Sequence, residues 1–150
     1  MTHKTISASI EVAAPRSAVW NALTSPEGVA ALFFGCRLVL APARLEAGAK
    51  YEYRGDDGKG NDIAHVVGEV LAAAPNERLV LVHQAGPTWQ PGPKTFRSRL
   101  SYLLEGEGAG TRLRIVQDEI DSDDPGYAHN AEGWPVFAAQ VKRFVETGKI

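Results

Sequence analysis

The chain has 150 residues, with 16 Lys and Arg against 18 Asp and Glu, so its formal net charge is −2. This length suits one domain, residues 1–150, that folds without disulfides, and the lone Cys36 allows no intrachain disulfide. The small net charge argues against a nucleic-acid partner or a membrane anchor, and neither a spanning segment nor a secretory signal is recognisable, so a cytoplasmic location is expected.

The first elements are a strand and two short helices. Residues 5–12 alternate apolar and polar side chains, which predicts a half-buried strand. Pro15 and the pair Ser25-Pro26 then predict two helix starts, because Ser is a good N-cap and Pro suits the first helical turn. The second helix is expected to end near Leu32. Runs separated by turn residues predict about six further strands, at 36–40, 50–54, 63–73, 78–83, 95–105 and 111–120.

The end of the chain changes its period. Apolar residues recur at helical spacing from Trp134 to Val145, which predicts an amphipathic helix that ends before Gly148. Pro135 either begins this helix or lies inside a longer one that starts near Asp124. The whole order predicts an α+β domain, in which an antiparallel sheet of about six to seven strands carries the last helix on one face.

Four segments of the chain follow a known pattern. They are residues 14–27 (APRSAVWNALTSPE), 68–80 (GEVLAAAPNERLV), 110–113 (GTRL), and 133–148, which opens with GW and closes with FVETG. Together with the order of elements, they resemble the AHSA-type family, named for homologues of the activator of heat-shock-protein ATPase. This family belongs to the START/SRPBCC superfamily. The chain departs from the pattern at Leu32-Phe33-Phe34-Gly35, where the family often has a Trp, and at Pro135.

The resemblance implies the helix-grip fold, in which a curved sheet wraps around the C-terminal helix and often leaves a cavity between them. The superfamily includes lipid and hormone carriers, polyketide cyclases and oxygenase components, so the fold does not settle the function. Residues on the inner faces of the last two strands and of the final helix are expected to line the cavity. They are Phe96, Leu100, Tyr102, Leu113, Ile115, Gln117, Trp134, Phe137 and Val141.

Polar residues that continue apolar strand faces are the acid–base candidates. They are His83 and Glu119, and no other catalytic residue is predicted. If they face inward, burial shifts their pKa values and suits them to proton transfer. The alternative places them at strand ends in water, and this is the expectation for Glu119. His65 is expected to face solvent.

The sequence contains no signature of a metal, cofactor or phosphate site. Its four histidines lack ligand spacing, and Cys36 lies in an apolar run that predicts a buried thiol. Four arginines, at 97, 99, 112 and 114, share the outer sheet face, either as a basic patch for an acidic partner or as a solvated face balanced by neighbours such as Asp118. Trp89 is either a lid over the cavity or, as expected, an anchor for its loop.

Three functions remain open at this point. The first is a carrier or sensor of an apolar small molecule, and this is the function we expect. The second is a polyketide-cyclase-like or hydrolytic enzyme. The third is a protein-interaction module, such as a chaperone regulator, which requires a filled core and a functional outer surface. A protein partner and the choice between monomer and homodimer stay open as well.

Overall fold

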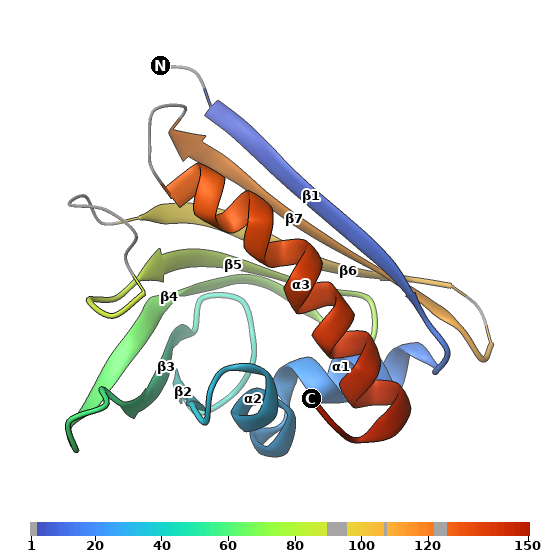
Figure 1. Ribbon diagram of the computed structural model, residues 1–150, viewed down its shortest axis with the longest axis horizontal. Helices are drawn as coiled ribbons and strands as arrows, with labels where there is room; N and C mark the ends of the chain where they lie inside the picture. The colour runs from blue at the N-terminus through green and yellow to red at the C-terminus, as the bar shows by residue number, and fades with distance from the viewer. Residues whose placement is uncertain (1–2, 90–95, 107, 122–125) are drawn as a thin grey trace.

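Figure 1 shows the computed structural model of the protein, which describes residues 3–89, 96–106, 108–121 and 126–150. One curved sheet supports a long C-terminal helix, and two short helices follow the first strand (Figure 1). The elements are β1 (His3–Val12), α1 (Arg16–Thr24), α2 (Pro26–Leu32), β2 (Arg37–Ala41), β3 (Lys50–Asp56), β4 (Asp62–Ala74), β5 (Arg78–Ala85), β6 (Arg97–Glu105), β7 (Thr111–Asp121) and α3 (Gly126–Thr147).

The sheet has seven strands in the order β1-β7-β6-β5-β4-β3-β2, and every neighbouring pair is antiparallel. Strands β2 to β7 form a meander, and the last strand, β7, also pairs with the first strand, β1. Helix α3 crosses one face of this sheet (Figure 1). The helix-grip fold predicted from the sequence is therefore confirmed, with both short helices and the final helix in their expected places.

Residue types explain the junction of the two short helices. The Ser25 hydroxyl oxygen accepts a hydrogen bond from the Gly28 amide at 3.0 Å, and Pro26 occupies the first turn of α2. A Cβ at position 28 would lie 2.0 Å from the carbonyl oxygen of Ala22, so only glycine allows α1 and α2 to approach this closely.

Helix α3 is the longer of the two predicted versions. It begins at Gly126, and Pro135 lies inside it. Residues 122–125, which precede the helix, lie outside the described part of the chain. Proline has no amide N–H, so the carbonyl of Ala131 loses its normal helical donor at this point. Trp134, Ala138 and Val141 face the sheet and are buried. Among the described residues, no helix is both long and apolar enough to cross a bilayer.

Candidate functional site

The predicted cavity-lining residues do come together between α3 and the sheet. Eight of them are buried, and Phe137 is partly buried against the same core. They arise from three elements and the residue just before β6, in the list Phe96, Leu100, Tyr102, Leu113, Ile115, Gln117, Trp134, Phe137 and Val141. Their side chains pack on one another, so the interior is closed in this structure; their role in binding stays a prediction.

Trp134 contacts three other rings of this interior. Its ring centroid lies 5.4 Å from that of Phe137, 6.3 Å from that of Tyr102 and 6.4 Å from that of His83, each in an edge-on arrangement. Edge-on contacts between aromatic rings are favourable beyond simple burial. The aromatic set continues from Phe137 through Phe33 to Tyr53, with centroid separations of 5.2 and 4.5 Å.

A chain of buried hydrogen bonds fixes the Trp134 indole. Its Nε1–H donates to Gln117 Oε1 at 2.6 Å, and Gln117 Nε2 donates to Ser98 Oγ at 2.7 Å. Gln117 is 0% exposed, so these bonds satisfy an amide that has no access to water. Ser98 was not among the predicted site residues, although a small polar residue between Phe96 and Leu100 on the inner face was the available signal.

Two other buried polar atoms lack a hydrogen-bond partner among the described residues: His83 Nδ1 and Tyr102 Oη. Strand pairing places them on either side of the Leu81–Leu100 pair, because His83 is opposite Ser98 and Leu79 is opposite Tyr102. An unpartnered buried polar group costs about 1–3 kcal/mol. Among the described residues, the interior therefore contains two unfavourable positions, and the rings of both residues lie edge-on to Trp134.

Burial keeps both groups neutral. His83 is half-buried as a residue, its Nδ1 has no contact with solvent, and burial lowers the pKa of His83 from 6.5 to about 4. Burial likewise raises the pKa of Tyr102 well above 10.0. At neutral pH the interior therefore presents an uncharged imidazole and an uncharged phenol.

Glu119 lies outside this interior. The pairing of β1 with β7 steps from Lys4–Ile120 to Ile6–Gln117, so β7 contains an extra residue at a bulge, where Glu119 has a φ of +59°. The bulge breaks the alternation beyond Gln117, so Ile120 is buried and Glu119 is exposed. The Glu119 carboxylate lies 3.7 Å from the Arg99 guanidinium, and we propose no shared acid–base role for it with His83.

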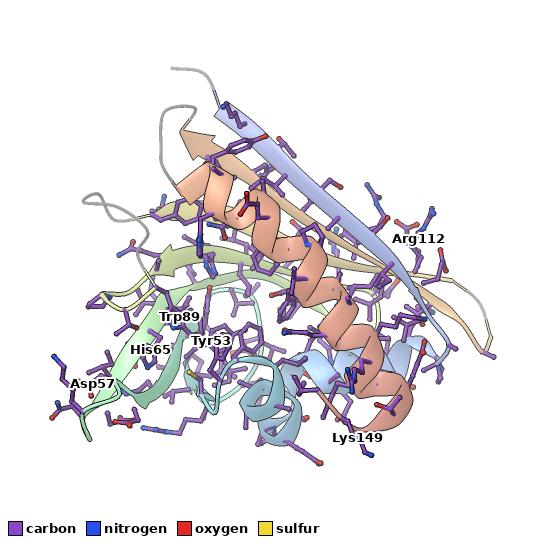
Figure 2. The ribbon with its side chains drawn as sticks, viewed as in Figure 1. Tyr53, Asp57, His65, Trp89, Arg112 and Lys149 are labelled. Atoms are coloured by element: carbon purple, nitrogen blue, oxygen red, sulfur yellow. The ribbon has the colours of Figure 1, made fainter. Side chains whose placement is uncertain are left out.

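The expectation that His65 faces solvent is wrong. The register of β3 and β4 steps from Tyr53–Val66 to Arg54–Ala64, so His65 is the extra residue of a bulge, and both His65 and Val66 are buried. The His65 ring accepts a hydrogen bond from the Thr88 hydroxyl and donates to the Asp56 carbonyl at 3.0 Å. Trp89 stacks on it at 5.3 Å, and Figure 2 shows the two side by side; Trp89 is thus an anchor where its loop is described.

Three further expectations from the sequence concern metal binding, the Cys36 thiol and the arginines of the outer sheet face. Within the described ranges, no group of three or more His, Cys, Asp or Glu side chains is placed to hold a metal ion. Cys36 is buried, and burial raises the pKa of its thiol. On the outer sheet face Arg99 pairs with Asp118 at 2.6 Å, Arg112 with Glu11 at 3.0 Å and Arg114 with Glu105 at 3.1 Å, so acidic neighbours balance these arginines.

Two hollows of the surface lie elsewhere. One, of about 380 Å³, is on the sheet around Val67 and Val82, and the other, of about 230 Å³, is between α1, α2 and the end of α3. None of the predicted interior residues lines either hollow. They therefore do not give access to the space around Trp134.

The fold and its aromatic interior define a helix-grip protein with a closed centre. The family described as Activator of Hsp90 ATPase homolog 1-like protein matches residues 13–146, and the chain belongs to that family. No curated protein matches the chain significantly.

Solved structures share the fold. Protein MLL2253 from Mesorhizobium loti is 21% identical, with a TM-score of 0.76 over 98% of this chain and 100% of its own. The Aha1 dimer from Colwellia psychrerythraea is 21% identical, with a TM-score of 0.71 over 98% of this chain and 99% of its own. DynU16, from the dynemicin biosynthetic locus, is 27% identical, with a TM-score of 0.69 over 97% of this chain but only 48% of its own.

Proposed function

We propose that the protein binds a small uncharged molecule, apolar or amphipathic, between α3 and the sheet, as a carrier or sensor. The observation that carries this proposal is a pair of buried polar atoms that have no hydrogen-bond partner among the described residues, His83 Nδ1 and Tyr102 Oη. A few polar groups in an apolar interior is the composition of a small-molecule site. A ligand that bonds to these atoms would remove the cost of leaving them unpaired.

The character of the interior supports an uncharged ligand. In the part of the chain that the structure describes, no Lys, Arg, Asp or Glu is among the buried residues. A charged ligand would lose its hydration without gaining an opposite charge, which is costly in an apolar environment. Neutral His83 and Tyr102 offer hydrogen bonds only.

Native mass spectrometry of freshly purified protein, followed by denaturation and analysis of what is released, tests the proposal. We expect a stoichiometric apolar or amphipathic adduct. The variant Leu100→Trp fills the interior between His83 and Tyr102 and should lose the adduct. Val136→Trp adds the same bulk at a 59% exposed position of α3 and should keep it.

The outcomes separate two classes of function. An adduct that disappears in Leu100→Trp but persists in Val136→Trp supports an interior ligand, provided that both variants unfold cooperatively. An adduct that persists in both variants, or no adduct at all, contradicts the proposal. A bare protein would favour a filled core with a functional outer surface. The same spectrum distinguishes monomer from homodimer, a question that the dimeric Aha1 structure makes specific.

A further inference from the structure

The indole of Trp134 occupies the position that a ligand would need. Its ring lies edge-on to the rings of both residues whose polar atoms lack a partner among the described residues, with centroid separations of 6.4 Å for His83 and 6.3 Å for Tyr102. It also holds the inner hydrogen-bond acceptor of the site, because its N–H donates to Gln117 Oε1 at 2.6 Å. A ligand in contact with the same groups must displace this side chain.

The helix is weakest next to this side chain. Pro135 follows Trp134 directly and removes one helical hydrogen bond, and Gly133 precedes it. A Cβ at Gly133 would meet nothing within 4 Å, so no close contact requires a glycine there. Glycine and proline are the two residues least favourable inside a helix. The sequence Gly-Trp-Pro thus places a soft point of α3 at the residue that closes the interior.

Gln117 determines which hydrogen-bonding group a ligand must have. Its Nε2 is already used by Ser98, at 2.7 Å, and only its Oε1 is held by a group that can leave. If the indole moved out, this oxygen would be a buried acceptor without a donor, which is unfavourable. The replacing molecule must therefore supply an O–H or N–H at this point.

We propose that Trp134 is a plug in the ligand site, and that the ligand is a flat, uncharged aromatic molecule whose O–H or N–H donor replaces the indole N–H at Gln117 Oε1. This inference rests on the proposed function and specifies its ligand class. Flatness follows from the space that the indole leaves among the rings of His83, Tyr102 and Phe137. The ligand needs a hydrogen-bond donor because Gln117 Oε1 would otherwise be left without one.

The test uses two probes that differ in one donor: 2-naphthol and 2-methoxynaphthalene. Binding is measured by calorimetry to the whole chain and to Trp134→Phe, which keeps an aromatic side chain but loses the hydrogen bond to Gln117. A side chain at position 134 that is held less firmly competes less well with the ligand for the same space. Since a net hydrogen bond is worth about 0.5–1.5 kcal/mol, 2-naphthol should bind this variant about two- to tenfold more tightly than the unmodified protein.

Selectivity and a control complete the prediction. Trp134→Phe should prefer 2-naphthol over 2-methoxynaphthalene, because Gln117 Oε1 then lacks a donor. Trp20→Phe, a half-buried position of α1, should leave both affinities unchanged. In the unmodified protein, 2-naphthol should shift the indole N–H resonance that Trp134→Phe removes.

Each opposite result has a definite meaning. Weaker binding of 2-naphthol by Trp134→Phe makes Trp134 a wall of the site and ends the plug proposal, while the proposed function stands. Equal binding of the two probes ends the role of Gln117. If neither probe binds although the native spectrum shows an adduct, the ligand class is wrong. If neither probe binds and no adduct exists, the proposed function fails as well.

Discussion

Tyr102 carries a buried hydroxyl without a described partner, whereas the hydroxyl of Tyr51 donates to the carbonyl of Val82 at 2.9 Å. The same substitution should therefore have opposite effects at the two positions. We expect Tyr102→Phe to raise the free energy of unfolding of the ligand-free protein by about 1 kcal/mol, and Tyr51→Phe to lower it by a similar amount. Urea denaturation at pH 7 measures both, and equal losses would mean that Tyr102 has a partner.

His83 predicts a dependence of stability on pH. Its pKa is lowered from 6.5 to about 4 by burial, so the unfolded chain binds the proton more strongly than the folded protein. Stability is then complete above pH 6.5 and falls as the pH drops from 6.5 towards 4, by about 3 kcal/mol in total.

Denaturant midpoints across this range provide the measurement. His83→Leu should flatten the profile between pH 6.5 and 4, because it removes the buried base. His129→Gln, at an exposed position of α3, should leave the profile unchanged. A profile that stays steep in His83→Leu would assign the effect to another group.

Among the secondary-structure elements, Pro135 and the glycines of the helices affect the stability of α3 and the packing of α1 against α2. Pro135→Ala restores the helical donor for the Ala131 carbonyl and should stabilise the protein by up to about 3 kcal/mol. It should also slow hydrogen exchange of the amides in residues 127–134. Pro26→Ala, in the first turn of α2, removes no helical bond and should change little. Unchanged exchange in Pro135→Ala would show that the helix is not soft there.

Two glycines in helices should respond to alanine with opposite signs. At Gly28 the new Cβ would lie 2.0 Å from the Ala22 carbonyl oxygen, so α1 and α2 must separate, which we expect to cost about 2 kcal/mol or more. At Gly133 the Cβ meets nothing within 4 Å, and alanine should stabilise by about 1 kcal/mol. Thermal unfolding of the two variants measures the sign of each change in stability. Stabilisation by Gly28→Ala would contradict the close packing of the two helices.

At the scale of the whole molecule, a bound ligand should stabilise the entire fold, because α3 and the sheet enclose the site together. At a free concentration of about 100 times Kd, a ligand adds about 2.7 kcal/mol, which for a chain of this size raises Tm by about 5–10 °C. Protein stripped by unfolding and refolding should therefore melt lower than protein as purified. An identical Tm would argue against a retained ligand.

The elements, their order and most of the inner face could be predicted from local patterns in the sequence. Alternation, helical spacing and the Ser25-Pro26 start are local signals, so β6, β7 and α3 could be predicted from neighbouring residues alone. The hydrogen bonds of Gln117 could not be predicted in the same way. Its partners come from β6 and α3, far along the chain, and only folding brings them to one point.

Which polar residues face inward depends on the folded structure and could not be predicted from local patterns. One extra residue at a bulge reverses the alternation of a strand, and nothing in the local pattern shows where it lies. The bulge in β4 buries His65, which was expected in solvent, and the bulge in β7 leaves Glu119 in water while Gln117 stays inside. The closure of the interior by Trp134 likewise depends on how α3 crosses the sheet, because a side chain's partners are set by packing between elements.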